Sequence, residues 1–444
     1  MKKFWLQCLS ITVFVFGMMW VVSKITDLKF FQAFDPISQA LTDFEMTDYA
    51  FSNLRPDPDV DQRIVIVNLA PTRALIAQQI MKMKQDKPKV IGIDSFFNCE
   101  GGLYDTLNCP QLLDTLGNLM LANAIQEAGN VVLVSKLMQT KKLQAGEETD
   151  VYDSIEYSDR MFSEHALNAF ASLPTEADYQ EDVKQCRSIF PSLMVNRRRE
   201  LAFSVGMSML YDSVKTKGFL ARNKIEEIIN FRGNVEIQDT RLASLSSKDL
   251  STTRYPIMFY AIDWEAFLND EYVHDIFNNS IVIMGSLGDY FGDPSWDDKF
   301  FTPLNKKVAG RANPDMFGVV LHANVVAMII NEDFVNELSP WQKYSIAFLA
   351  CLFTVALFIV IDKKLPTWFD ALSVLIQVFL ILATSGLVVY GFASFAYKLD
   401  LSLTIASSAL VGPCYDIFKG FKNQFAIWRK KRMLTNTSEE VLTN

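Results

Sequence analysis

The chain has 444 residues, of which 50% are hydrophobic and 21% are charged, and its formal net charge is −9 at pH 7. The apolar share exceeds that of most soluble chains, while the charged share excludes a protein embedded in a membrane along its whole length. Two lysines before residue 24 and ten basic against six acidic residues after residue 340 leave residues 24–340 with a charge of −15. So acidic a segment disfavours nucleic acid as a partner.

Four strongly apolar stretches enclose this acidic segment. Each approaches the ~20 residues that a helix needs to cross a hydrocarbon core of ~30 Å. They cover residues 4–22, 344–361, 371–392 and 395–415. The last is the weakest, because Lys398 and Asp400 lie near its start and Pro413 near its end. If it lay flat on the membrane, the basic tail would fall on the opposite side.

Basic residues set the expected orientation. Lys2 and Lys3 precede the first span, Lys363 and Lys364 follow the second, and a basic cluster follows the fourth. With four spans, all lie on one side, which the positive-inside rule makes cytoplasmic. A cleaved signal peptide is the alternative for the first stretch, but no small-x-small site precedes Lys24. We therefore expect a multi-pass protein of a bacterial inner membrane with both termini cytoplasmic.

The expected domains follow from these spans. They are a membrane anchor (1–23), a periplasmic body (24–340), a three-helix membrane segment (341–417) and a short basic tail (418–444).

Strand and helix patterns alternate in the body. Short β-branched runs at 63–69 (RIVIVNL), 89–94 (KVIGID) and 130–135 (NVVLVS) predict strands buried on both faces. Helical patterns lie between them, from residue 71 and over 116–127. This order predicts an α/β fold with a mainly parallel sheet. A polar insertion is expected over 139–181. The pattern resumes with a helix over 200–214, strands at 226–231 and 280–284, and a helix over 319–331.

Several short motifs occur in an order that resembles one sensory family. They are Phe34-Asp35, Asp59–Asp61 before RIVIVNL, VIGID, RSIFP (187–191), NFRG (230–233), SIVIMGS (280–286), Asp298-x3-Thr302-Pro303-Leu304 and GVVLHAN (318–324), with three spans behind them. The chain thus resembles the second type of the CHASE domain, an extracellular sensory domain associated with cyclases and histidine kinases. The resemblance implies signal transduction across the membrane.

The sequence departs from that family pattern in two places. Asn68-Leu69-Ala70 stands where family members usually carry acidic residues after the first strand. Only residues 418–444 follow the last span, too few for a cyclase or kinase fold. We therefore expect the output to lie in a separate protein.

Candidate ligand-binding residues cluster where parallel strands end, because ligands bind outside the carboxyl ends of such sheets. Strand ends supply Asn68, Asp94, Ser135 and Ser286. Asp94 is as well placed to cap the following loop as to contact a ligand. The family-like motifs add Asp298, Thr302 and His322, and Arg232 is expected to pair with one of the carboxylates. A histidine between Leu321 and Ala323 is, however, usually a core residue.

Chemistry beyond binding has little support in the sequence. With three histidines and no nucleophile, phosphate-loop or zinc motif, we expect neither an enzyme nor a cofactor or metal. Cys99 and Cys109 form a candidate disulfide, with Cys186 free and Cys8, Cys351 and Cys414 packed in the spans.

Partners are expected for the cytoplasmic tail and for the periplasmic body. Arg429, Lys430, Lys431 and Arg432 are candidates for contact with anionic lipid or a cytoplasmic partner. The spans lack the unpaired buried charges of a transporter. We interpret the chain as a sensor-like receptor or accessory subunit that binds a periplasmic ligand or protein and acts through a partner or a second copy. The alternative is a structural subunit of an envelope complex that uses the body as a protein-binding scaffold.

Overall fold

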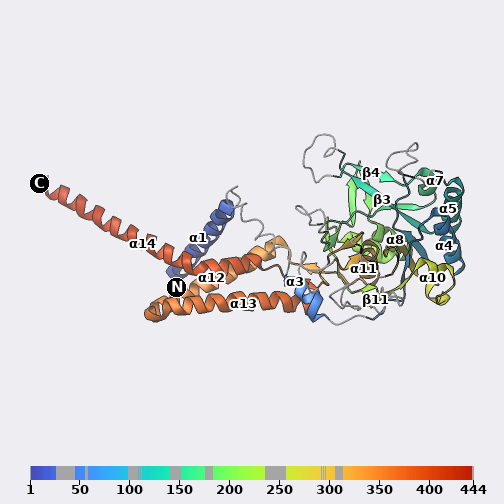
Figure 1. Ribbon diagram of the computed structural model, residues 1–444. Helices are drawn as coiled ribbons and strands as arrows, with labels where there is room; N and C mark the ends of the chain where they lie inside the picture. The colour runs from blue at the N-terminus through green and yellow to red at the C-terminus, as the bar shows by residue number, and fades with distance from the viewer. Residues whose placement is uncertain are drawn as a thin grey trace. The chain divides into compact units, whose positions relative to one another are not determined.

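The computed structural model describes residues 2–26, 46–55, 59–98, 109, 111, 113–140, 152–175, 184–235, 257–291, 293, 295, 297–305 and 314–442 (Figure 1). The chain divides into two units. Residues 51–335 form one unit, which we call the body, and residues 1–50 with 336–444 form the other, which we call the helical unit.

A mainly parallel sheet runs through the body. Its strand order is β10-β11-β1-β12-β2-β3-β4, and β5 also pairs with β3. The strands are β1 (Ile64–Asn68), β2 (Val90–Ile93), β3 (Val131–Met138), β4 (Ser154–Tyr157), β5 (Leu167–Phe170), β10 (Asn234–Val235), β11 (Ile257–Ile262) and β12 (Ile281–Gly285). All pairings are parallel except β3 with β4. The α/β fold with a mainly parallel sheet is therefore confirmed.

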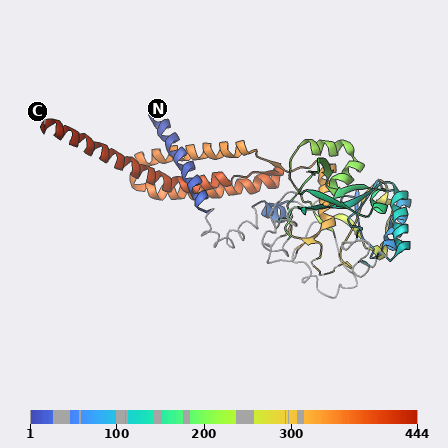
Figure 2. The same ribbon diagram turned by 90° about the horizontal axis from the view of Figure 1, so that it is seen from above.

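Helices cover both faces of this sheet (Figure 2). Side chains alternate along a strand, so Val65, Val67, Ile91 and Ile93 pack against α4 (Arg73–Gln85) and α5 (Thr115–Ala128). On the other face, a Cβ on Gly92 would meet Phe203 and Met207 of α8 (Phe203–Tyr211). A Cβ on Gly285 would meet Val319 of α11 (Gly318–Asn331). Every residue of β1, β2 and β12 is buried, as the apolar runs predict.

Local capping explains where the main helices begin and end. The Thr72 hydroxyl accepts a hydrogen bond from the Leu75 N–H at the start of α4, and Asp114 accepts one from the Gly117 N–H at the start of α5. Gly129, at a φ of 70°, ends α5 in the left-handed conformation that favours glycine.

Three predicted elements differ from the structure. The polar stretch 139–181 contributes β4 and β5 to the main sheet, beside α7 (Arg160–Ser163). The helix expected over 200–214 is replaced at its start by strand β8 (Arg198–Leu201). Asp212 caps a new helix, so α8 is followed by α9 (Ser213–Ala221). The strand expected over 226–231 is reduced to β9 (Glu227–Ile228).

The remaining elements of the body are short. They are η2 (Ala50–Leu54), β6 (Ser188–Ile189), β7 (Ser192–Val195), β8 (Arg198–Leu201), α10 (Trp264–Leu268), η5 (His274–Phe277), β13 (Lys299–Phe300) and β14 (Met316–Phe317). β6 pairs with β9, β7 with β8 and β13 with β14, all antiparallel.

Among its described residues, the helical unit contains three helices long and apolar enough to cross a membrane, at residues 2–24, 340–364 and 366–395. They comprise α1 (Lys2–Thr26), α12 (Pro340–Lys364) and α13 (Phe369–Phe395) with its leading turn η6 (Pro366–Trp368). The predicted fourth span lies in α14 (Ser402–Leu442), which begins later than expected and continues past Pro413. Short elements α3 (Met46–Tyr49), β15 (Asn336–Glu337) and β16 (Tyr397–Lys398) complete this unit.

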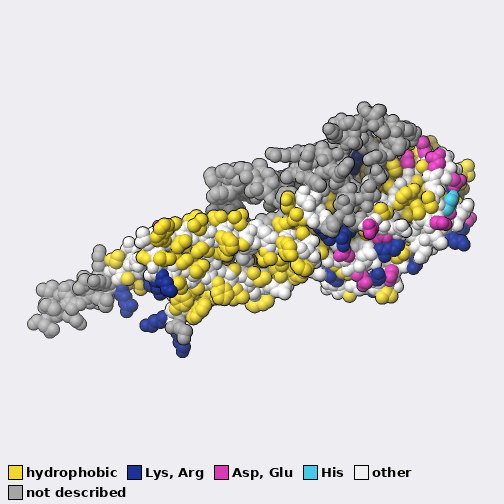
Figure 3. Space-filling view, turned by 90° about the horizontal axis from the view of Figure 1, so that it is seen from below, with side chains coloured by type: hydrophobic (Ala, Val, Ile, Leu, Met, Phe, Trp, Pro, Cys, Tyr) yellow, Lys and Arg dark blue, Asp and Glu magenta, His cyan; other side chains and the backbone are white. Residues whose placement is uncertain are grey.

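An apolar cluster with polar ties holds the helical unit together. Cys8, Cys351 and Cys414 are buried in it, together with residues of α1, α12 and α14. Lys343 pairs with Asp400 at 2.7 Å and Lys419 with Asp362 at 2.7 Å, which link α12 to the segment of α14. Hydrophobic side chains cover much of the surface of this unit, acidic side chains gather on the body, and Lys and Arg side chains appear on both units (Figure 3). Such a surface is typical of helices in lipid.

Candidate functional site

Two carboxylic acids meet the amino-terminal end of α11 where the strands of the sheet end. Asp94 directly follows β2, and the antiparallel register of β13 with β14 brings Asp298 next to Gly318. The Gly318 N–H donates a hydrogen bond to the Asp298 carbonyl at 3.0 Å. We call Asp94 and Asp298 the carboxyl pair.

Two glycines allow this close approach. A Cβ on Gly285 would lie 2.7 Å from the Val319 Cβ and 3.2 Å from the Asp94 Cβ. A Cβ on Gly318 would lie 3.0 Å from an Asp298 carboxylate oxygen. Real Cβ atoms do not tolerate the shorter of these contacts, so any larger residue would push α11 away from β12.

The carboxyl pair is poorly suited to carry two negative charges. Burial and the nearby charge of Asp298 raise the pKa of Asp94 to about 8. Burial raises the pKa of Asp298 to about 6, although Lys184 and the Gly318 N–H favour its ionised form. The Asp94 carboxyl makes no hydrogen bond with any described residue. Asp94 as a whole is only half-buried and Asp298 is exposed, so the desolvation that raises both pKa values is partial and solvent weakens its energetic effect. A proton or a cationic group would therefore be favoured there.

Asn68 is committed to internal hydrogen bonds. Its amide donates to the Asp263 carboxylate at 2.9 Å and to the Gly288 carbonyl at 3.1 Å. Its oxygen accepts from the Leu287 N–H at 2.9 Å. The side chain is 1% exposed, so Asn68 fixes the loop after β12 and the start of α10. Asn68 thus forms a neutral internal crosslink at the end of β1.

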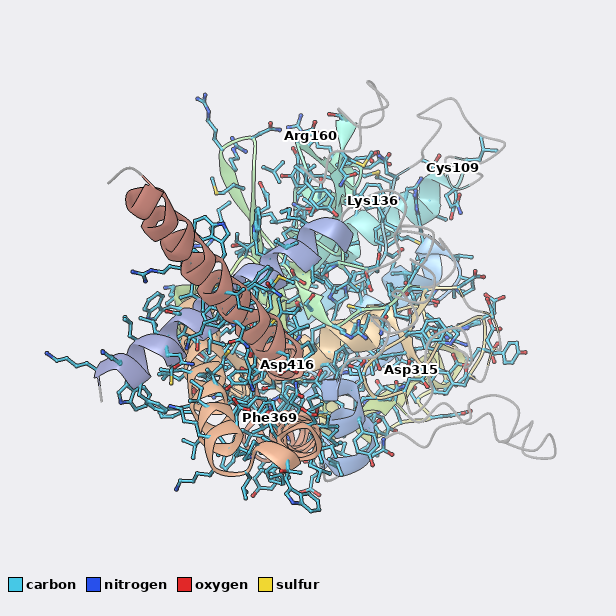
Figure 4. All side chains as sticks on the ribbon, turned by 90° about the vertical axis from the view of Figure 1, so that its left-hand side faces the viewer. Cys109, Lys136, Arg160, Asp315, Phe369 and Asp416 are labelled. Atoms are coloured by element: carbon cyan, nitrogen blue, oxygen red, sulfur yellow. The ribbon has the colours of Figure 1, made fainter. Side chains whose placement is uncertain are left out.

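Thr302 and Ser286 also serve the local backbone. The Thr302 hydroxyl and N–H both donate to the carboxylate of Asp315 (labelled in Figure 4), and the Asn305 amide adds a third bond. Burial raises the pKa of Asp315 to about 7, and these hydrogen bonds oppose the rise. The exposed Ser286 hydroxyl accepts from the Gly288 N–H at 3.3 Å. Thr302 therefore ties the chain after Asp298 to the strand that precedes α11.

His322 is a core residue. It is 3% exposed, and its ring packs edge-to-face on Phe203 with centroids 5.2 Å apart. Burial lowers the pKa of His322 to about 4, so the imidazole is neutral at pH 7. Its Nδ1 has no hydrogen-bond partner among the residues that the structure describes.

Arg232 lies away from the carboxyl pair. Its guanidinium pairs with Asp333, beyond the carboxyl end of α11, and its N–H donates to Asn324 at 2.9 Å. The expected pairing with a carboxylate at the strand ends is therefore wrong, because Asn324 holds the NFRG loop against the middle of α11. Arg55 lies close by, where burial and the charge of Arg232 lower the pKa of Arg55 to about 10.

The segment that follows α11 is held at several points. The Asn230 amide donates to the Asp333 carbonyl at 2.9 Å, and Arg222 donates to the Val335 carbonyl at 3.1 Å. The rings of Phe219 and Phe334 stack with centroids 5.4 Å apart. We call residues 332–335 the exit segment, because they are the last residues of the body before the helical unit.

Comparison with known families identifies the chain. The CHASE2 domain family matches residues 30–360, about three quarters of the sequence. The chain belongs to the CHASE2 family. CHASE2 is an extracytoplasmic sensory domain, and together with the apolar helices it indicates a membrane protein with a sensor-like role. Neither the curated proteins nor the solved structures contain a match.

Two carboxylates outside the CHASE2-like motifs bind residues of those motifs. Asp315 receives Thr302, and Asp333 receives Arg232. The sequence predicts that Thr302 faces a ligand and that Arg232 pairs with a carboxylate at the strand ends, yet each has its acidic partner elsewhere in the chain. A search for acidic residues near the ends of the 319–331 helix would have found both.

The other candidates of this CHASE2 chain are its cysteines and its tail. Cys109 (labelled in Figure 4) is disulfide-bonded, whereas Cys99 lies outside the described residues. Cys8, Cys186, Cys351 and Cys414 are free and buried. In the tail, Arg429 is exposed on α14; Lys430, Lys431 and Arg432 continue that helix, but their side chains lie outside the described part.

Proposed function

We propose that this CHASE2 protein is a receptor or accessory subunit of a bacterial inner membrane. Its body, outside the cytoplasm, binds a ligand or protein and acts through a separate polypeptide. The basic residues at both termini and after α12 support cytoplasmic termini through the positive-inside rule. The family supports the sensory part of the proposal.

The observation that carries the proposal is the position of α11. This helix begins at the carboxyl pair and ends at the exit segment, and residues 318–330 are all buried. A buried, close-packed helix moves as one piece, because packed interiors do not deform continuously. A small displacement at Gly318 therefore reaches Asp333 and Val335.

The chemistry of the carboxyl pair indicates the kind of ligand. Two carboxyls whose ionised forms are disfavoured gain most from a positively charged group, such as an ammonium, or from protons. Such a ligand would relieve repulsion between Asp94 and Asp298 and change their packing on α11. A ligand can shift the equilibrium between two arrangements of the body only as far as its affinities for those two arrangements differ. The proposal assigns binding, not catalysis, to this pair.

A scaffold role remains the second candidate, and one observation favours it. Asn68 and Thr302, two residues expected to face a ligand, are buried and hydrogen-bonded internally. A body whose strand ends are partly filled in this way could act mainly through its surface.

Hydrogen exchange on the full chain in detergent tests the receptor proposal. After a pH step from 9 to 6, corrected for intrinsic exchange, we expect amide exchange in residues 330–335 to change at least threefold. The double variant Asp94→Asn/Asp298→Asn should lose most of this change, while Asp315 still titrates in both proteins. Asp297→Asn, which alters an exposed neighbouring carboxylate, should behave as the wild type. An unchanged response in the double variant would refute coupling through α11.

Crosslinking in native membranes tests the output. A soluble kinase or cyclase crosslinked to the tail supports signalling through a partner. Outer-envelope components alone would favour the scaffold.

A further inference from the structure

An arginine-rich hairpin stands out on the acidic body. β7 and β8 pair from Ser192 with Leu201 to Val195 with Arg198. The two turn residues, Asn196 and Arg197, have φ of 49° and 64°. Two-residue turns of this type usually place glycine in the second position, because other residues pay ~1 kcal/mol or more for that backbone. The hairpin therefore keeps a guanidinium at its tip against local backbone preference.

Three consecutive arginines lie at the tip of this hairpin and on its second strand, followed by Glu200. Arg197, Arg198 and Arg199 are exposed, and none forms an ion pair with a residue that the structure describes. Arg199 donates only to the Ser192 hydroxyl, at 2.8 Å. Met194, opposite Arg199 in the pairing, is 64% exposed. We call Met194 and Arg197–Arg199 the basic arm.

The stem of the arm is fixed to the sheet. Val195 is 2% exposed and Ala202 is 5% exposed. The Ala202 N–H donates to the Pro191 carbonyl at 3.2 Å, and Ala202 forms a β-bridge with Phe170 of β5. The arm is thus held in a defined position, which lowers the entropic cost of binding through it.

An acidic counterpart lies on the same body. Glu265, Asp270, Glu271 and Asp275 are exposed around α10 and η5, with Val273 59% exposed among them. Lys82 pairs with Asp270 at 2.6 Å, and the other three carboxylates form no ion pair with a described residue. We call these four acids and Val273 the acidic patch.

We propose that the basic arm docks on the acidic patch of a second copy of this chain, head to tail. The arm adjoins β5 beside β3, whereas α10 follows β11 near the other end of the strand order, so one body does not join its own two surfaces. The basic arm combines three positive charges with the exposed Met194, and the acidic patch combines four negative charges with the exposed Val273. Arginine favours such contacts because its planar fork matches carboxylates.

The symmetry of this contact has a consequence. Because different surfaces meet, each copy leaves one arm and one patch free, so the contact repeats and forms rows or rings. Each exposed ion pair is weak and is screened by salt. Association therefore depends on confinement of the copies to one membrane and falls at high ionic strength.

A charge-exchange experiment tests the proposal. Full-length chains carrying donor or acceptor dyes are placed in phosphatidylcholine liposomes, and energy transfer between copies is measured. We expect transfer in 50 mM salt that falls at least threefold in 500 mM salt. Energy transfer in 50 mM salt should be at least threefold lower than in the wild type when all chains are arm-reversed (R197E/R198E/R199E). The same loss is expected when all chains are patch-reversed (E271K/D275K). When the two variants are mixed, transfer should return to within twofold of the wild type. K217E, an exposed reversal elsewhere, is the matched control.

Other outcomes overturn the proposal. Failure of the mixture to recover excludes arm-to-patch docking. Arm-dependent transfer that requires phosphatidylglycerol assigns the arm to anionic lipid instead. A second measurement tests the geometry: Met194→Cys and Val273→Cys copies should crosslink with a short bismaleimide when mixed. Crosslinking of Met194→Cys copies with one another would indicate a symmetric contact and refute the head-to-tail arrangement.

Discussion

Replacing Asp94 with asparagine should change how the stability of the body depends on pH. The folded pKa of about 8 lies above the ordinary value of 3.8, so the folded state holds this proton more tightly than the unfolded chain. Stability is then fully present below pH 4 and is lost as the pH rises toward 8. Each pKa unit corresponds to about 1.4 kcal/mol, which gives an upper bound of about 6 kcal/mol.

The realised effect should be smaller. Asp94 is only half-buried and shares its shift with Asp298, and solvent and coupling reduce the energy, so we expect about 2 kcal/mol. Asparagine cannot ionise. Asp94→Asn should therefore gain about 2 kcal/mol over the wild type at pH 9 and much less at pH 5. Asp315, with its raised pKa, and His322, with its lowered pKa, titrate in both proteins and cancel in the difference.

Pulse proteolysis of the full chain in detergent, over a urea series at pH 5 and pH 9, measures this difference. Asp297→Asn, which alters the exposed carboxylate next to Asp298, serves as the control and should show no pH-dependent gain. A stability difference for Asp94→Asn that is the same at both pH values would refute the raised pKa. A gain in stability at pH 5 that disappears at pH 9 would show that folding lowers the pKa of Asp94 instead of raising it.

Further predictions concern packing, linkage and topology. Asn68→Ala should destabilise the body by about 2–3 kcal/mol in the same assay, because it leaves buried groups without partners. Gly285→Ala should cost about 1–3 kcal/mol through its clash with Val319, whereas Gly218→Ala, which meets nothing within 4 Å, should stabilise α9 by about 0.5–1 kcal/mol. Arg232→Ala should raise amide exchange in the exit segment more than at β1, since Asp333 loses its partner. Protease added to spheroplasts should digest the body and spare an epitope at residue 444; the reverse pattern would invert the orientation.

The sequence predicts the buried strands well because burial leaves a direct mark on composition. A strand enclosed on both faces is an unbroken β-branched run, as at 64–68 and 281–285. Strand order leaves no such mark: β12 lies between β1 and β2, although it follows them by some two hundred residues. The hairpin at 192–201 was missed because its turn carries Asn-Arg in place of the usual glycine.

The sequence predicts which candidate site residues lie at the strand ends, but it does not predict which residues they hydrogen-bond or pair with. The rule of strand ends correctly brings Asp94 near the start of α11, where Asp298 also lies. The same rule selects Asn68, whose amide instead bonds to Asp263 and Gly288. Which side chain is left accessible depends on acids far along the chain, such as Asp315 and Asp333, that only the folded structure places.

The late arrival of β12 has a consequence for biogenesis. The central strand β12 pairs with β1, where Ile64 lies opposite Ile281, and with β2. Until β12 is available, the edges of β1 and β2 that face it have unpaired backbone N–H and C=O groups. Exposed strand edges of this kind aggregate, and distant pairings form slowly. The amino-terminal half of the body therefore cannot mature while it is being exported. The sheet can close only after nearly all of the body has emerged, because β12 comes so late in the chain.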